Sequence, residues 1–193
     1  MLMDAKNLSQ ALMKCKDDII KEVNNNLPRK VGVMAVNHFR DNFRRGGFVN
    51  GGLQPWQKTR RQIDDGSPYS PLTSRRNHLM SSTTSVPGIG MVTIRNDVPY
   101  AVIHNDGGTI DTHPTVTPRL RKFAWYKFYS LSANRSEDDP QASMWKAIAL
   151  TKNRTLHVHG TMPQRQFIGE SAELTARIDE LIRKAILALL NAD

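Results

Sequence analysis

The amino-acid sequence predicts an α+β fold with two N-terminal helices, a small antiparallel sheet with a hairpin, and a C-terminal amphipathic helix. Three observations lead to this prediction. Apolar residues recur every three or four positions at both ends of the chain, which is the helical period. Two β-rich runs in the middle flank a turn rich in proline and glycine. The length of 193 residues fits a single domain with long loops, so residues 1–193 are treated as one domain.

The first expected helix covers residues 4–24, whose apolar side chains form one stripe that would face a core or a partner. They are Leu8, Ala11, Leu12, Cys15, Ile19 and Val23. The run Asn24-Asn-Asn-Leu-Pro28 is expected to break this helix, and Pro28 suits the first turn of a second one. That second helix should run to about Arg45, with an apolar ridge of Val31, Ala35, Phe39 and Phe43.

Residues 46–71 are expected to form a long loop, because Gly, Pro, Gln, Arg and Asp dominate there and Trp56 is the single large anchor. Loops of this length inside a compact domain are usually functional or become ordered against a neighbour. The segment is therefore either an assembly arm or a surface loop pinned by one tryptophan. After it, Thr73 can cap a short helix over residues 74–81.

A β-hairpin is predicted next. Thr83–Val86 and Met91–Arg95 are rich in β-forming residues, and they flank the turn sequence Pro87-Gly-Ile-Gly90.

The stretch of residues 98–110, VPYAVIHNDGGTI, reverses the chain in one of two ways. Pro99 can begin a short helix in which Tyr100 and His104 lie on one side and Gly107 supplies the positive φ that ends it. Alternatively, Asp106-Gly107 is a tight hairpin turn between residues 100–104 and 109–116. In both cases Tyr100 and His104 brace a backbone corner.

The following segment is expected to contain a helix and a short strand. Thr117 can cap, and Pro118 can open, a helix over residues 119–129. Residues 130–141 are polar and acidic, which indicates a surface excursion. Residues 156–159 then have the pattern of a short strand.

Residues 162–169 are expected to be extended and to lead into the last helix. That helix begins near Ser171, with Glu170 and Glu173 in its first turn, as the helix dipole prefers. Its apolar stripe consists of Leu174, Ile178, Leu181, Ala185 and Leu189.

The net charge is +9, from 27 basic and 18 acidic residues, and the excess lies in the first two thirds of the chain. Such a field favours a polyanion or an acidic protein as a neighbour. The longest apolar run, residues 185–190, is too short for a membrane span, so no membrane partner is expected.

His104 beside Asp106 could act as a general base, which would make the chain an enzyme. However, the sequence contains no G-x-S-x-G, H-E-x-x-H or P-loop pattern. A lone His and Asp also lack the third group that a catalytic triad requires. We therefore expect no enzymatic activity and no cofactor.

His157 and His159 are two apart, so they would project on the same side of a strand and could chelate zinc with His104 or His113. No spaced Cys/His companion pattern accompanies them. Paired histidines on a solvated strand face are the simpler interpretation, and no metal is expected.

Arg119, Arg121 and Lys122 lie among aromatic residues, which is typical of proteins that stack on single-stranded nucleic acid. They are the candidate nucleic-acid contacts. Aromatic residues at these spacings also pack protein cores, and no recognisable nucleic-acid-binding module surrounds them.

Four landmarks follow one another from about residue 40 to the C-terminal helix. They are Asn42-Phe-Arg-Arg-Gly-Gly-Phe48 followed by Trp56; Leu72-Thr73 with Leu79-Met-Ser-Ser-Thr83; Val98-Pro-Tyr-Ala-Val-Ile-His-Asn-Asp-Gly-Gly108; and Pro163-Gln-Arg-Gln-Phe-Ile-Gly169. In this series the chain resembles the phage virion morphogenesis family, the tail-completion and head-to-tail joining proteins of tailed phages and prophages.

The resemblance singles out two sets of motif residues. The family's pattern of Tyr-Ala, two residues, His and Gly-Gly matches Tyr100, Ala101, His104, Gly107 and Gly108. Its Pro-x-Arg-x-Phe-x-Gly segment matches Pro163, Arg165, Phe167 and Gly169. Many members are shorter where this chain carries residues 111–161, so that segment is an expected insertion.

The resemblance implies a structural subunit rather than an enzyme. Such a subunit would form a homo-oligomeric ring at the neck or tail end of the virion, completing the tail or joining it to the head. Its partners would be further copies of itself and other neck, connector or tail-tube proteins, with DNA nearby, and it would assemble in the host cytoplasm. A basic nucleic-acid-binding protein is the alternative from another class.

Overall fold

The computed structural model describes residues 5–64, 66–134 and 139–191 and has the predicted α+β fold. The chain divides into two compact units, one of residues 1–108 and 163–193 and one of residues 109–162. The second unit covers nearly the same residues as the expected insertion. The strands form three separate two-stranded sheets instead of one small sheet.

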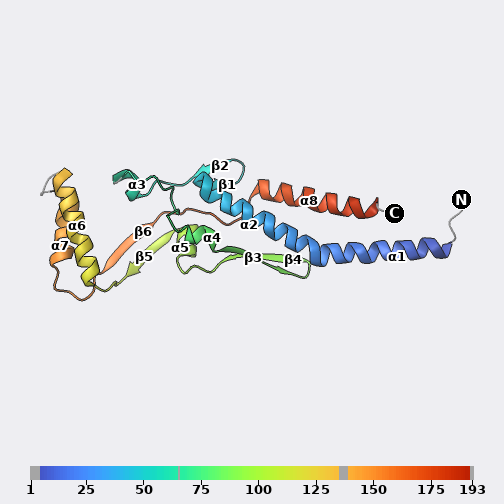
Figure 1. The fold of residues 1–193 in the computed structure, drawn as a ribbon, viewed down its shortest axis with the longest axis horizontal. Helices are drawn as coiled ribbons and strands as arrows, with labels where there is room; N and C mark the ends of the chain where they lie inside the picture. The colour runs from blue at the N-terminus through green and yellow to red at the C-terminus, as the bar shows by residue number, and fades with distance from the viewer. Residues whose placement is uncertain (1–4, 65, 135–138, 192–193) are drawn as a thin grey trace. The chain divides into compact units, whose positions relative to one another are not determined.

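In the first unit, α1 (Ala5–Lys21) and α2 (Leu27–Arg45) are joined by the π-helical turn η1 (Glu22–Asn26), as Figure 1 shows. The expected helix break is therefore wrong. The Leu27 N–H donates to the Glu22 carbonyl, five residues back, and the Glu22 carboxylate accepts from Asn26 Nδ2 and Lys30 Nζ, both at 2.6 Å. Pro28 follows this turn, in the first turn of α2.

The predicted ridge of α2 is confirmed, because Ala35, Phe39 and Phe43 are buried and Val31 is half-buried. The hairpin of β3 (Thr83–Gly88) and β4 (Met91–Asn96) is also confirmed, and it packs against α2. Helix α2 can approach β3 closely because Gly32 has no side chain. A Cβ at Gly32 would lie 2.8 Å from Ser85 Oγ. The turn of the β3–β4 hairpin consists only of Ile89-Gly90, because Pro87 and Gly88 pair with β4.

Residues 46–71 are not a structureless loop. They contain β1 (Gly47–Val49), β2 (Leu53–Pro55) and the short helix α3 (Arg60–Asp64). The two strands approach so closely at Gly47 that a Cβ would lie 2.4 Å from the Gln54 carbonyl oxygen. Composition favours a loop here, but backbone pairing of a hairpin needs few apolar side chains.

The short helix α4 (His78–Ser81) is half the predicted length. Thr73 does not cap it, because the Thr73 hydroxyl donates to the Ser70 carbonyl at 2.7 Å. The helix instead starts after Asn77, whose φ is +45°.

The corner is a short helix, α5 (Ala101–Asp106), that ends at Gly107 with a φ of +73°. The first of the two interpretations of VPYAVIHNDGGTI is thus correct, and the hairpin turn at Asp106-Gly107 is wrong. Residues 163–169 are extended and irregular, as expected, and lead into α8 (Ala172–Leu190). Ser171 caps α8 by accepting from the Leu174 N–H.

The second unit consists of β5 (Gly108–Thr112), α6 (Pro118–Asn134), α7 (Pro140–Leu150) and β6 (Val158–Met162), with β5 paired to β6. The helix predicted after Thr117 is confirmed, and the Thr117 hydroxyl accepts from the Leu120 N–H. The surface excursion is wrong for residues 130–134, which extend α6, and for Pro140 and Gln141, which begin the unpredicted α7. Residues 135–138 of that excursion lie outside the described residues.

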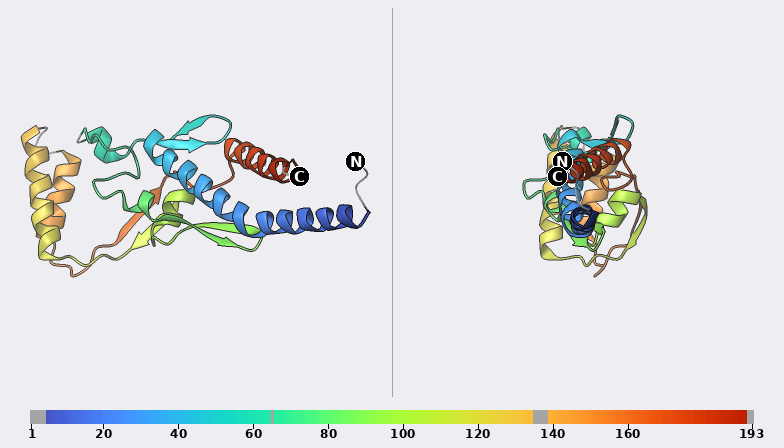
Figure 2. Two further views of the ribbon diagram at one scale, coloured as in Figure 1. Left: turned by 45° about the vertical axis from the view of Figure 1, so that its right-hand side comes forward. Right: turned by 90° about the vertical axis from the view of Figure 1, so that its right-hand side faces the viewer.

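The core of the second unit lies between α6 and α7. It is made of small residues and one aromatic side chain: Ala124, Phe128, Ala142 and Ala149. Asp139 starts α7 by accepting from the N–H groups of Gln141 and Ala142. Figures 1 and 2 show the two helices side by side. No helix among the described residues is long and apolar enough to cross a membrane.

Candidate functional site

Segments far apart in the sequence meet in the first unit, and the motif residues lie where they meet. We call this region the motif junction, made of Asn42, Phe43, Trp56, His104, Asn105, Arg165 and Phe167. Asn42 is fully buried on α2. Its Nδ2 donates to the Phe167 carbonyl at 3.2 Å, and its Oδ1 accepts from the Val49 N–H at 3.3 Å. One buried amide thus joins α2, β1 and the segment of residues 163–169.

Three aromatic rings form the apolar centre of the motif junction. The Phe43 ring lies 5.6 Å from the Trp56 ring and 5.0 Å from the Phe167 ring, measured between centroids. The Trp56 indole N–H also donates to the Gln166 carbonyl at 2.8 Å. Trp56 therefore anchors its own segment to residues 163–169, as the interpretation of a segment pinned by one tryptophan expects.

The corner joins the same segment through its backbone. The Arg165 N–H donates to the His104 carbonyl at 2.8 Å. Asn105 Oδ1 accepts from the N–H groups of both Phe167 and Ile168, at 2.9 and 3.0 Å. The structure therefore brings together the two motif sets that the sequence singled out.

The side chain that connects these two motif sets, Asn105, was not singled out from the sequence. Its only sequence signal is its place between His104 and Asp106. A short polar residue before a glycine pair is ordinary in turns, so nothing marked it as a long-range contact.

The geometry of His104 is that of a packed side chain. Its ring meets the ring of Tyr100, the N-cap residue of α5, edge-on at 5.8 Å, as expected for two residues four apart. Its Nδ1 is buried and has no hydrogen-bond partner among the described residues. Asp106 accepts from Asn105 Nδ2 at 2.7 Å. Burial, and secondarily the charge of Arg165, lowers the pKa of His104.

The remaining motif residues support the same backbone. Arg165 is 5% exposed and its Nε donates to the Gln57 carbonyl at 3.1 Å. Gly108 has a φ of +136°, and Pro163 and Gly169 are half-buried in the extended segment. The junction as a whole positions chain segments by hydrogen bonding and packing.

Acidification below pH 6.5 is expected to destabilise the first unit. Burial is the main cause of a lowered pKa at His38 as well as at His104. An unfolded histidine takes up a proton near its ordinary pKa of 6.5, whereas the folded one resists until lower pH. The unfolded state therefore binds more protons below pH 6.5, so the stability present above that pH is lost as pH falls.

Melting temperatures measured from pH 7 to pH 5 at constant ionic strength would check this. The variant His104→Phe keeps a ring beside Tyr100 but removes the titration, so its melting temperature should fall less steeply than that of the wild type. The exposed His78 provides the control, because His78→Phe should retain the wild-type slope. Equal slopes in all three proteins would contradict the expectation.

The candidate nucleic-acid contacts lie on α6 in the second unit. The Arg121 side chain is already hydrogen-bonded within the protein, because its Nη1 donates to the carbonyls of Ala149 and Thr151, at 3.0 and 2.5 Å. These are carbonyls at the end of α7, so Arg121 holds the helix pair together. Arg119 and Lys122 are exposed.

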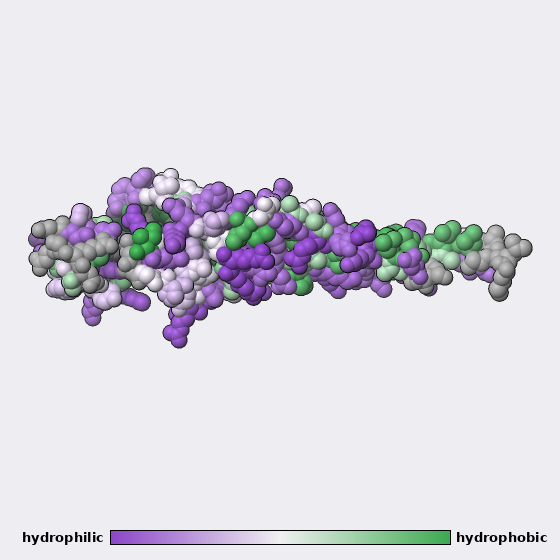
Figure 3. Space-filling model, turned by 90° about the horizontal axis from the view of Figure 1, so that it is seen from above, coloured by the Kyte–Doolittle hydropathy of each residue, from purple (hydrophilic) through white to green (hydrophobic). Residues whose placement is uncertain are grey.

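Apolar side chains remain exposed on three elements of the first unit. On α1, Leu8 is 49% exposed, and Leu12 and Met13 are each 63% exposed. At the tip of the β3–β4 hairpin, Ile89 is 81% and Met91 is 64% exposed. The last turns of α8 expose Leu187 and Leu190. Figure 3 shows apolar residues along the part of α1 that extends past α8.

The expected stripe of α1 is therefore only partly covered. Ala11, Cys15 and Ile19 are half-buried, whereas Leu8 and Leu12 face solvent. Within the first unit, α1 adjoins α2 with a bend at η1 and extends beyond both the hairpin and α8 (Figures 1 and 2). Its N-terminal half has no other described element of this unit beside it.

Comparison of the chain with protein-family models, with curated proteins and with solved structures finds no match.

Proposed function

We propose that this chain is a non-enzymatic structural subunit of a tailed phage or prophage that completes the tail or joins it to the head. It works as a homo-oligomeric ring at the neck or tail end. The resemblance to the virion morphogenesis family motivates the proposal. The contacts of the first unit and its uncovered apolar surfaces support it.

The motif junction supports a structural role for the motif residues. The Asn42 amide, the Trp56 indole and the Asn105 amide each bond to the backbone of residues 166–168. These contacts between the motif residues stabilise the fold of the first unit. A role in folding accounts for the motif residues without any catalytic activity. The junction therefore serves as a scaffold from which α1, α8 and the β3–β4 hairpin extend.

The observation that carries the proposal is the uncovered apolar face of α1. A single helix of this length is marginally stable in water, and most helical stability in proteins comes from packing of the apolar face. Leu8, Leu12 and Met13 nevertheless line an open apolar depression on α1. A protein partner that covers this face would remove apolar area from water and stabilise the helix.

We infer that the partner is a second copy of this chain. The chain exposes apolar side chains on α1 and, separately, at the hairpin tip and the end of α8. Two different surfaces on one chain allow head-to-tail contacts, and such contacts close into a ring when the rotation is right. The excess of basic charge would then face acidic neighbours or the DNA that passes nearby.

Replacing Leu12 with glutamate is expected to dissociate the oligomer. A carboxylate on the apolar face of α1 must lose its water when the face is covered, whereas it stays hydrated in the monomer. The matched control is Gln10→Glu, which adds the same charge on the opposite side of the helix. Light scattering after size exclusion should give the ring mass for the wild type and the control, and the monomer mass for Leu12→Glu.

Negative-stain images of the same samples would show ring-shaped particles for the wild type and the control. A wild type that stays monomeric at high concentration, and does not bind purified tails or tail tubes, would contradict the proposal. Removal of the gene from its phage should leave separate heads and tails. Virions that assemble and infect normally without it would reject the proposed function.

A further inference from the structure

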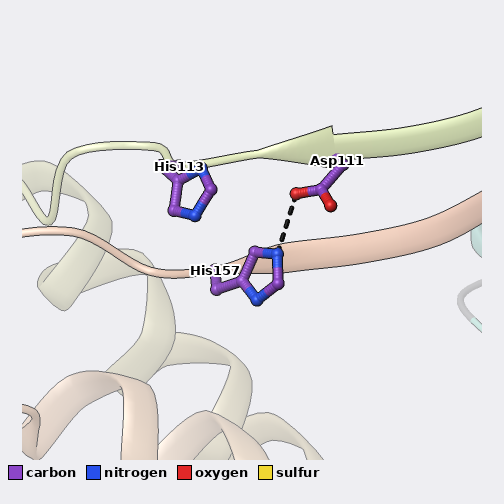
Figure 4. A group of neighbouring side chains, drawn as sticks. All are labelled: Asp111, His113 and His157. Atoms are coloured by element: carbon purple, nitrogen blue, oxygen red, sulfur yellow. Dashed lines mark hydrogen bonds and ion pairs between the residues drawn. The ribbon is translucent and has the colours of Figure 1, made fainter.

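Three side chains with metal-binding atoms lie together in the second unit: Asp111, His113 and His157. Asp111 belongs to β5, His113 follows β5, and His157 directly precedes β6. One ligand atom from each residue lies within 4.8 Å of the others. Figure 4 shows the two imidazole rings side by side and the Asp111 carboxylate next to His157.

A nitrogen and an oxygen of the cluster already lie nearly as far apart as two ligand atoms of one metal ion. His157 Nε2 lies 2.8 Å from Asp111 Oδ1, and the rings of His113 and His157 are stacked with centroids 4.7 Å apart. On the other side, His159 Nδ1 lies 3.6 Å from Asp111 Oδ2. Two histidines thus flank one carboxylate, and a third stacks on one of them.

These distances suit a tetrahedral metal ion. Zinc binds imidazole nitrogen and carboxylate oxygen at about 2.0–2.2 Å, which separates neighbouring ligand atoms by about 3.3 Å. The 2.8 Å distance between His157 Nε2 and Asp111 Oδ1 must therefore lengthen slightly when a metal ion binds, and the longer distances between ligand atoms must shorten. All four side chains are exposed, so their rotation is little restricted by packing.

The donor types select among metal ions. Imidazole nitrogen suits zinc and its borderline neighbours, whereas calcium and magnesium prefer oxygen ligands only. An ionised carboxylate only accepts hydrogen bonds, so the His157 Nε2–H donates a hydrogen bond to Asp111 Oδ1 in the metal-free protein. Metal binding at Nε2 moves this proton to Nδ1 by exchange with solvent, so the imidazole stays neutral and the Nε2 lone pair bonds the metal.

The position of the cluster indicates what a bound ion would do. His113 and His157 stand on the two chain segments that lead into α6 and out of α7. Those segments are held by the short β5–β6 pair and by an isolated β-bridge between Thr115 and Thr155. Two-stranded pairs are marginally stable in water, so a cross-link at this point would fix the base of the α6–α7 helix pair.

We propose that Asp111, His113 and His157, with His159 as a fourth ligand, form a zinc site that clamps β5 to β6 at the base of the α6–α7 helix pair. The role is structural. This inference concerns the second unit and does not depend on the proposed function, so each can fail without the other.

Titration of full-length, tag-free protein with Zn²⁺ after EDTA treatment tests the site. We expect one ion per chain, and Co²⁺ should give the visible bands of tetrahedral coordination. His157→Ala and Asp111→Asn should each weaken binding by on the order of 100-fold, because loss of even a second-shell partner costs about 10–100-fold. His78→Ala, which removes an exposed histidine of the first unit, should bind as the wild type does.

A thermal readout separates a clamp from surface binding. Zn²⁺ should raise the melting temperature of the second unit in the wild type and in His78→Ala, and leave His157→Ala unchanged. Circular dichroism would show that the variants remain folded, since the substituted side chains are exposed. Equal zinc affinity in His157→Ala and the wild type, or binding without any rise in melting temperature, would overturn the proposal.

Discussion

Phe167→Ala should lower the free energy of unfolding of the first unit by about 3–5 kcal/mol, the usual cost of truncating a buried phenylalanine to alanine. Phe167 is 1% exposed and packs on Phe43 at the centre of the motif junction. Its removal leaves a cavity between α2 and the extended segment. The hydrogen bonds from the Trp56 indole and the Asn42 amide end on this segment, so they weaken with it.

Trp56 fluorescence can report this loss separately from the second unit. The chain has three tryptophans, and in a background with Trp125→Phe and Trp145→Phe the only indole left is Trp56. Urea denaturation followed by this signal should show the lower stability in Phe167→Ala. Phe123→Ala is the control, because Phe123 is 46% exposed and belongs to the second unit. If Phe167→Ala unfolded at the same urea concentration as the wild type, the motif junction would not hold the first unit together.

Gly107→Val should have the next largest effect, because Gly107 combines a φ of +73° with a ψ of −173°. This region of backbone space is essentially restricted to glycine, and occupying it with another residue costs about 1–3 kcal/mol. A β-branched side chain adds steric conflict with its own backbone. Relief of the strain would change the direction in which the chain leaves α5. The carbonyl of His104 and the amide of Asn105 would then move away from residues 165–168.

The comparison of three variants would distinguish backbone strain from side-chain loss. Gly107→Val should melt at a lower temperature than His104→Ala, because the latter loses packing without forcing the backbone. Gly160→Val is the control: Gly160 has open space around its Cα and lies in a strand, where valine is favoured. If Gly107→Val melted like the wild type, Gly107 would not be required at the corner, and His104 would need another explanation.

The elements predicted correctly from the sequence are those in which local pattern and final packing agree. The ridge of α2 is one example, because its apolar periodicity matches the face that the core covers. The β3–β4 hairpin is another, because β-forming residues flank a turn rich in proline and glycine. The start of α8 belongs with them, since the Ser171 cap is a local interaction. Such signals lie within a few residues of each other and do not depend on distant segments.

The elements predicted wrongly depend on interactions that a local pattern does not contain. The asparagine run before Pro28 continues as a helix because a π turn and the Glu22 contacts accommodate it. Within the expected loop, residues 47–55 form a hairpin through backbone pairing, with few apolar side chains to signal it. The helix α7 was missed because an acidic stretch preceding it suggested a surface excursion, whereas Asp139 is its cap.

The sequence by itself therefore determined the α+β class, the order of most helices, and the corner at Gly107, because these follow from periodicity and from the φ that glycine permits. Only the tertiary structure decided that Asn105 bonds to residues 167 and 168, and that His157 lies beside Asp111. These pairs are separated by more than forty residues along the chain. Contacts between distant residues depend on how whole elements pack, and side-chain type alone does not specify which partner a polar group will find.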